Sequence, residues 1–243
     1  MQPHEYGAWN QNALTLSKNI TPQFKTTRDT TFMLEHVSVD DGKRYLQRIQ
    51  NEYNLTDYEV SNFCSKNDNI GGAQRHRYTD SVIVSPSSLR YLFHAFKIMD
   101  LNPLSIVEVG GGYGGLALLL FAVAEWKGVS FKSYIIYDLP GPVALQRSYL
   151  KIVGHDNFIE WRDAISCASD FNEIGFTLVA TYSISEFDRE TSDAYISNLI
   201  PKVNKYFFAW NSRHRNPLLS LAKEVPEDPQ TGAINVLLSY ETS

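Results

Sequence analysis

The stretch from about Leu104 to the C-terminus alternates short apolar runs, rich in β-branched and aromatic residues, with longer segments of helical periodicity. Such alternation is typical of an α/β protein in which a mostly parallel sheet carries helices on both faces. The apolar runs predict strands at Ser105–Val109, Ser133–Tyr137, Phe158–Trp161, Phe176–Tyr182, Lys205–Trp210 and Ile234–Tyr240. The intervening segments predict helices at Tyr113–Trp126, Pro142–Val153, Arg189–Ile200 and Pro217–Glu224.

The last predicted strand follows a connection that contains Pro226, Pro229 and Gly232. This turn-rich connection is too short to need a crossover helix, so we expect the C-terminal strand to run antiparallel to its neighbours.

The residues before the sheet show helical patterns with clear start signals. Lys43–Tyr53 and Thr56–Lys66 predict helices, and Thr56 with Glu59 forms a capping box at the start of the second. Ser85 as N-cap and Pro86 at the first helical position predict a further helix through Met99. The first thirty or so residues are polar and without a regular pattern. We therefore expect a flexible or irregular arm (1–37), a helical cap (38–103) and a sheet domain (104–243).

Composition restricts the partners. The 243 residues are 43% hydrophobic and carry a formal net charge of -5, which favours a globular protein without a nucleic-acid footprint. Cys64 and Cys167 are the two cysteines and form no CxxC pair, which argues against a disulfide framework or a cysteine-rich zinc site. The longest apolar run, Leu116–Ala124, is too short to cross a membrane, and Met1–Ile20 lacks the pattern of a secretory signal. We expect a cytoplasmic protein without a membrane span.

A glycine-rich segment, Val107–Gly115, follows the first predicted strand and opens the first helix. Glycines at such a junction let the backbone approach a ligand and direct N–H groups at it, so the segment predicts a bound polar ligand. Gly110, Gly112 and Gly115 also match the GxGxxG spacing of dinucleotide-binding proteins. No Lys-Ser/Thr pair follows, which excludes a P-loop.

Three acidic residues bear on the choice of ligand. Glu108 precedes the first glycine, where its negative charge suits the ammonium of S-adenosylmethionine and would repel the pyrophosphate of NAD. Asp138 ends the second strand, where a carboxylate binds the hydroxyls of a ribose in either cofactor. Asp163 follows the third strand and is interpreted either as an acceptor for the adenine amino group or as an N-cap.

The chain resembles the sugar O-methyltransferases, a branch of the Rossmann-like S-adenosylmethionine-dependent methyltransferases, from roughly Asn67 to the C-terminus. The resemblance rests on segments 67–71, 85–91, 106–115, 137–140 and 182–186. It implies a methyltransferase domain at 104–243, S-adenosylmethionine as cofactor, and a carbohydrate acceptor such as a deoxyhexose, for example rhamnose, in a surface glycan. The residue pattern and the resemblance together give the expected cofactor residues: Glu108, Gly110, Gly111, Gly112, Tyr113, Gly114, Asp138, Leu139, Asp163, Tyr182, Arg90 and Tyr91. Gly71-Gly72-Ala73 departs from the family's Gly-Asn-Pro at that place.

Methyl transfer to a hydroxyl needs a group that removes the hydroxyl proton. Glu186, after the fourth strand at the ligand-binding edge of the sheet, is the leading candidate, and His214, after the fifth strand, is the second. His94 has no evident partner in the sequence. Ser185, with Tyr182, is expected to line the acceptor pocket, and Asp68 and Asp188 are further candidates to bind the substrate.

A divalent cation is an alternative activator, and Asp68, Glu186, Asp188 and His214 offer suitable donor atoms without a spacing that demands a metal. Two other functions stay open: an NAD(P)-dependent sugar oxidoreductase and a non-catalytic glycan-binding module. The sequence is also compatible with a homo-oligomer.

Overall fold

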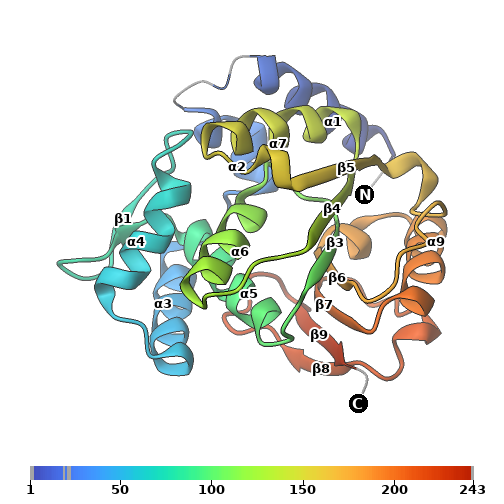
Figure 1. The fold of residues 1–243 in the computed structure, drawn as a ribbon. Helices are drawn as coiled ribbons and strands as arrows, with labels where there is room; N and C mark the ends of the chain where they lie inside the picture. Colours follow the sequence, from blue (N-terminus) through green and yellow to red (C-terminus); the bar gives the residue numbers. More distant parts are fainter. Residues whose placement is uncertain (1–2, 19, 21–22, 242–243) are drawn as a thin grey trace.

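The computed structural model describes residues 3–18, 20 and 23–241, and the side chains of residues 3–6 are not described (Figure 1). Its helices are α1 (Pro3–Lys18), α2 (Arg28–Met33), α3 (Val39–Tyr53), α4 (Asp57–Asp68), α5 (Pro86–Met99), α6 (Gly115–Trp126), α7 (Pro140–Ile152), α8 (Ser183–Glu186) and α9 (Arg189–Leu199). Its strands are β1 (His76–Arg77), β2 (Ile83–Val84), β3 (Ser105–Val109), β4 (Ser133–Asp138), β5 (Ile159–Asp163), β6 (Thr177–Thr181), β7 (Lys205–Trp210), β8 (Lys223–Pro226) and β9 (Val236–Glu241).

The main sheet has seven strands in the order β5-β4-β3-β6-β7-β9-β8. Strands β3 to β7 pair in parallel, and β9 pairs antiparallel with β7. The predicted mostly parallel sheet with an antiparallel C-terminal strand is therefore confirmed. Because Val109 is opposite Tyr137 in the parallel register, the chain leaves β3 and β4 at the same edge of the sheet.

Side chains alternate between the two faces of the sheet and build one core on each. Ile106 of β3 packs in a core that includes residues of α5, α6 and α7, whereas Val107 and Val109 pack in a second core with residues of α9. Helices thus cover both faces, as predicted (Figure 1).

The start signals of the cap helices have the expected structure. Thr56 and Glu59 form both hydrogen bonds of a capping box at the start of α4. The hydroxyl of Ser85 accepts a hydrogen bond from the amide of Ser87, and Pro86 occupies the first turn of α5. These local signals set the helix starts because they satisfy amide groups that lack a partner within the helix.

The N-terminal arm is not irregular where the structure describes it, and this prediction is wrong there. It forms α1 and α2, while residues 1–2, 19 and 21–22 of the arm lie outside the described residues. Helix α1 lies along α7 (Figure 1): the amide of Gly141 donates to Oδ1 of Asn10 at 2.7 Å, and Ser148 donates to the carbonyl of Ser17. A β-carbon at Gly141 would stand 1.9 Å from the carbonyl oxygen of Asn10, so glycine permits this close contact.

The predicted helix Pro217–Glu224 is also wrong. The chain forms only a short 3-10 turn, Pro217–Leu219, and then continues as the edge strand β8. Pairing with β9 supplies backbone hydrogen bonds that a helix would otherwise provide.

Among the described residues, no helix combines the length and the apolar character that a membrane crossing requires.

Candidate functional site

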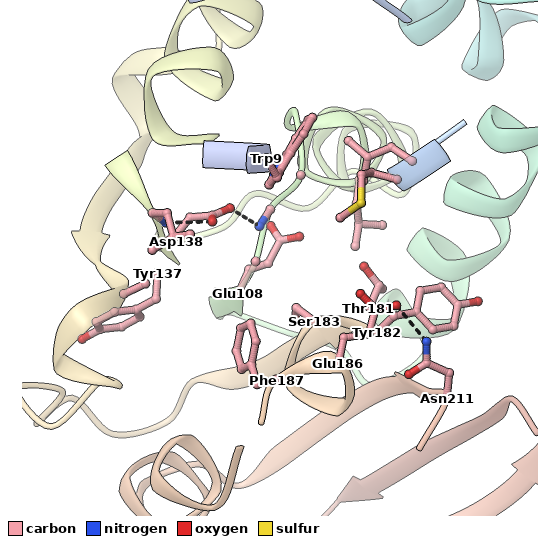
Figure 2. Close-up of a pocket in the computed structure, with 18 of the residues that line it drawn as sticks. Trp9, Glu108, Tyr137, Asp138, Thr181, Tyr182, Ser183, Glu186, Phe187 and Asn211 are labelled. Carbon is pink, nitrogen blue, oxygen red and sulfur yellow. Dashed lines mark hydrogen bonds between the residues drawn. The ribbon is translucent and has the colours of Figure 1, made fainter. Parts of the chain in front are cut away.

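A cavity of about 440 Å³ opens at the edge of the sheet where β3, β4 and β6 end (Figure 2). We divide its lining into two sides. The glycine-loop side comprises Glu108, Gly110, Gly111, Gly112, Asp138 and Leu139, and the α5 side comprises Arg90, His94, Tyr182, Thr231 and Asn235. Glu186, Asn211 and Asp188 also line the cavity. Figure 2 shows Asp138 and Asn211 on opposite sides of this space, with Glu108 between them.

The glycine loop is held in a backbone conformation that favours glycine. Gly110 has φ of 76° and Gly112 has φ of 57°, in the left-handed region. A β-carbon at Gly110 would stand 2.5 Å from the β-carbon of Ser183, which follows β6. The loop after β3 and the segment after β6 are therefore in direct contact, and a larger residue at Gly110 would separate them.

Glu108 is a fully buried carboxyl group that lines the cavity. It is 1% exposed and accepts a hydrogen bond from the hydroxyl of Tyr134 at 2.7 Å. Burial raises the pKa of Glu108 to about 8. No ion pair of Glu108 exists among the described residues. A cationic ligand group beside it would favour the ionised form.

Asp138 ties the glycine loop to the next strand. Its carboxylate accepts hydrogen bonds from the amides of Gly111 (2.9 Å) and Leu139 (2.8 Å) and from Nε2 of Gln146 (2.7 Å). Burial raises the pKa of Asp138 to about 6. Oδ2 accepts from both Gly111 and Gln146, whereas Oδ1 accepts only from Leu139. Oδ1 therefore keeps capacity for a ligand hydroxyl at the cavity wall.

The wall beside Asp138 is apolar. Trp9 of α1 reaches the cavity next to the loop (Figure 2), and Ala164 and Ile165 line it after β5. Asp163 does not line the cavity. Its side chain accepts a hydrogen bond from the amide of Ile165 at 2.9 Å and caps a 3-10 turn, which corresponds to the N-cap interpretation.

Two predicted site residues, Tyr113 and Asp68, lie outside the cavity in a buried polar network. The hydroxyl of Tyr113 donates to Glu35 at 2.7 Å, and Asp68 accepts from the amide of Ser85 at 2.7 Å. Lys25 donates to the carbonyl of Asn67 at 2.6 Å and lies 4.7 Å from the centre of the Tyr113 ring. These two residues therefore join the glycine loop to α4, α5 and the N-terminal segment.

This network was not predicted from sequence, because Lys25 and Glu35 fall in the segment expected to be irregular. Burial lowers the pKa of Lys25 to about 8, with Glu35 and Asp68 opposing that effect. Burial raises the pKa of Glu35, and Lys25 and the Tyr113 hydroxyl lower it in part.

Gly114, another predicted cofactor residue, does not line the cavity. It is the N-cap of α6 and has a φ of 98°.

The α5 side presents long nitrogen-bearing side chains. Arg90 and His94 are four residues apart on α5, hence on one face of the helix. Arg90 donates to the carbonyl of Leu34 at 3.1 Å, and Nε of Arg90 and both ring nitrogens of His94 have no hydrogen-bond partner among the described residues. Tyr91 lines the cavity as well. Buried nitrogens without partners are rare in folded proteins, so Arg90 and His94 are candidates to bind a ligand in this cavity.

A buried carboxylate, Glu227, stands behind this side. Its oxygens accept hydrogen bonds from Tyr45 (2.9 Å), Thr231 (2.9 Å), Asn235 (2.8 Å) and the hydroxyl of Tyr182. Burial alone would raise the pKa of Glu227, but His94 and these donors lower it well below the usual range of a glutamate. Glu227 is a functional candidate that sequence analysis missed, since its neighbours come from α3, the end of β6 and the connection before β9.

Glu186 lines the cavity, and its Oε1 accepts a hydrogen bond from Nδ2 of Asn211 at 2.8 Å (Figure 2). Burial raises the pKa of Glu186, and the Asn211 amide lowers it in part. Ser185 does not line the cavity; its hydroxyl donates to the carbonyl of Tyr182 at 2.7 Å. Asp188 lines the cavity and also caps α9, where the amide of Thr191 lowers its pKa.

His214 is not brought to the cavity. Its Nε2 lies 3.1 Å from Oδ1 of Asp193 on α9, and Nε1 of Trp210 donates to its carbonyl. His214, the second base candidate, therefore does not line the cavity, whereas Glu186 does. The four metal-donor candidates, Asp68, Glu186, Asp188 and His214, are not gathered, and the described part of the chain holds no cluster of three or more His, Cys, Asp or Glu side chains suited to a metal ion.

Comparisons with known proteins find solved structures that resemble this chain in fold, at low sequence identity. No protein-family model and no curated protein sequence matches the chain. The magnesium protoporphyrin IX methyltransferase of Synechocystis, solved with bound SAM, has 13% identity and a TM-score of 0.47, over 85% of this chain and 99% of that one. The methyltransferase domain of a bacterial Hen1 has 12% identity and a TM-score of 0.48, over 63% and 97% of the two chains. NodS, an N-methyltransferase of Bradyrhizobium japonicum in complex with S-adenosylhomocysteine, has 12% identity and a TM-score of 0.44, over 61% and 85%. At these sequence identities and TM-scores, the similarities identify neither the reaction of this protein nor its acceptor.

Proposed function

We propose that the protein is an S-adenosylmethionine-dependent methyltransferase that acts on a sugar hydroxyl. One observation supports the cofactor most strongly: the cavity has a buried carboxyl group, Glu108, on one side and a buried guanidinium with an unpartnered Nε, Arg90, on the other. The amino-acid part of S-adenosylmethionine carries an ammonium and a carboxylate, so it would satisfy both sides at once.

Named residues would hold each part of the cofactor. Glu108 would bind the ammonium, Arg90 with Tyr91 the carboxylate, and Asp138 the ribose hydroxyls. The apolar wall of Trp9, Leu139, Ala164 and Ile165 would cover the adenine. When bound, the cofactor supplies a methyl group on a positively charged sulfur, which is already electrophilic.

The remaining polar lining would bind the acceptor. Glu186, Asn211, Thr231 and Asn235 offer hydrogen-bonding groups of the kind that several neighbouring hydroxyls of a sugar require. Together with the sequence motifs, this lining supports a deoxyhexose such as rhamnose in a glycan as the acceptor. Of the two bases proposed from sequence, Glu186 is the one that lines the cavity.

The experiment is transfer of isotope-labelled methyl from S-adenosylmethionine to oligosaccharides that contain rhamnose, fucose or other deoxyhexoses, with mass spectrometry of the products. We expect a labelled methyl ether on one sugar, and less of that product from Glu186→Gln when the acceptor is limiting. Exposed Tyr58 of α4 offers a matched control, Tyr58→Phe, which should retain full turnover. Cofactor binding without transfer to any acceptor would instead favour a glycan-binding module.

A further inference from the structure

His94 is the least satisfied buried group of the cavity. Its ring is 1% exposed, it lines the cavity, and neither ring nitrogen has a hydrogen-bond partner among the described residues. Nε2 lies 3.6 Å from Oε1 of Glu227, beyond hydrogen-bond distance but close enough for strong electrostatic interaction. Nε2 of this imidazole therefore lies toward a carboxylate, and Nδ1 has no hydrogen-bond partner among the described residues.

Glu227 is a fixed negative charge at this place. Four donors from different parts of the chain, Tyr45, Tyr182, Thr231 and Asn235, hold its two oxygens, and its pKa is far below the ordinary range. Such a carboxylate stabilises a proton on the facing imidazole and favours the tautomer with hydrogen on Nε2. This tautomer leaves the lone pair of Nδ1 as the proton acceptor.

The charges around His94 keep the ring neutral before reaction. Burial lowers the pKa of His94, the facing Glu227 opposes that effect, and Arg90 on the same helix adds to it. The other titratable groups at the ring are the phenols of Tyr45 and Tyr182, with ring centres 6.4 and 6.2 Å away. A neutral imidazole with a carboxylate behind it is the arrangement required of a general base.

We propose that Nδ1 of His94, with Glu227 as its positioning partner, takes the proton of the acceptor hydroxyl. This inference rests on the proposed function. The O–H bond breaks and its proton moves to Nδ1, the oxygen forms a bond to the methyl carbon, and the carbon–sulfur bond breaks with its electron pair left on sulfur. The imidazolium then gives its proton to water after the products leave. Glu186, already bonded to Asn211, serves to bind the acceptor.

The test uses the full chain with His94→Gln, which keeps a polar side chain of similar length. We expect kcat to fall by about 100-fold or more, within the usual range for a lost general base. Affinity for S-adenosylhomocysteine, measured by calorimetry, should change by less than about threefold, because His94 contacts the acceptor. Glu186→Gln should raise KM for the acceptor more than it lowers kcat.

A second readout does not depend on turnover. NMR of isotope-labelled histidine rings, with the His94 signal identified by its loss in His94→Gln, gives the titration of that ring directly. Glu227→Gln removes the facing negative charge, so the His94 titration and the acidic limb of the kcat/KM profile should both move to lower pH. If Glu227→Gln does not fold, Glu227→Asp shortens the side chain and withdraws the negative charge from the ring. The His94 titration and the acidic limb should then move in the same direction by a smaller amount.

The two proposals fail in different ways. If wild-type protein transfers no methyl group to any acceptor, the proposed function falls and the inference falls with it. If wild-type protein is active and His94→Gln keeps more than roughly a tenth of kcat, the proposed function stands and His94 is not the base. An unmoved His94 titration in Glu227→Gln would overturn the role of Glu227.

Discussion

The two sides of the cavity are built by different means. The glycine-loop side consists of backbone and two buried carboxyl groups, Glu108 and Asp138, whose pKa values burial raises. The α5 side consists of long side chains, and Arg90 and His94 have unpartnered nitrogens among the described residues. One side therefore favours a cation and the other favours acceptor atoms. The contrast teaches that the cavity suits a ligand that carries both a positively and a negatively charged group.

Gly110→Ala tests whether the first side depends on backbone geometry, and it has the largest expected effect. The new β-carbon would combine a φ of 76° with a 2.5 Å approach to Ser183, which should lower the free energy of unfolding by about 3 kcal/mol. Gly128→Ala is the matched control, because its φ of 69° is similar and its surroundings are open; it should cost only about 1 kcal/mol. Equal losses in urea unfolding would contradict the close contact.

Arg90→Gln tests the charge of the α5 side. If Arg90 binds the cofactor carboxylate, affinity for S-adenosylhomocysteine should fall by about 2 to 3 kcal/mol, while affinity for 5′-methylthioadenosine, which lacks that carboxylate, should stay unchanged. Calorimetry of both ligands gives the comparison. An equal loss for both would show that Arg90 acts through the fold rather than through the carboxylate.

The pH dependence of cofactor binding tests the role of Glu108 on the glycine-loop side. Its pKa of about 8 means that it is protonated below that pH in the ligand-free protein. Binding a cation must then release that proton, so affinity for S-adenosylmethionine should rise with pH by up to about tenfold per unit below pH 8 and level off above it. Glu108→Gln should lose this dependence. The amino group of the ligand also titrates, but it does so equally with both proteins, so the difference between their pH dependences reports Glu108 alone. If affinity changes with pH to the same extent in wild type and Glu108→Gln, Glu108 does not bind the ammonium.

Trp9→Ala has the smallest expected effect and tests whether α1 belongs to the glycine-loop side. Loss of an aromatic wall should weaken S-adenosylhomocysteine binding by about 1 kcal/mol, or roughly fivefold. Tyr58→Ala, on an exposed part of α4 away from the cavity, should bind like wild type in the same titration.

The comparison also explains how much could be predicted from sequence. The parallel strands and the places of Glu108 and Asp138 follow from local patterns, because a strand, its glycines and the next helix are contiguous. The pairing of His94 with Glu227 could not be predicted, since it needs the packing of α5 against the connection before β9. Tyr113 shows the same limit: it lies within the predicted loop, but its side chain turns into a network with Glu35.

The errors at both ends of the chain have one physical origin. Helix α1 has little pattern of its own and is stabilised by docking on α7 through contacts such as Asn10 with Gly141. Strand β8 exists because β9 offers a free edge, which overrides the helical signal of Pro217. Within the chain, the ring of His214 likewise pairs with Asp193 of α9 and does not line the cavity. Tertiary contacts, which single-sequence patterns do not contain, decide each case.

The most direct test of the central claim is calorimetric titration of the wild-type protein with S-adenosylhomocysteine and, in parallel, with NADH. A cavity that offers Glu108 and Arg90 to a zwitterionic amino-acid group should bind S-adenosylhomocysteine and not NADH, and Arg90→Gln should weaken that binding. Binding of NADH without binding of S-adenosylhomocysteine would contradict the account and favour a nicotinamide-dependent oxidoreductase.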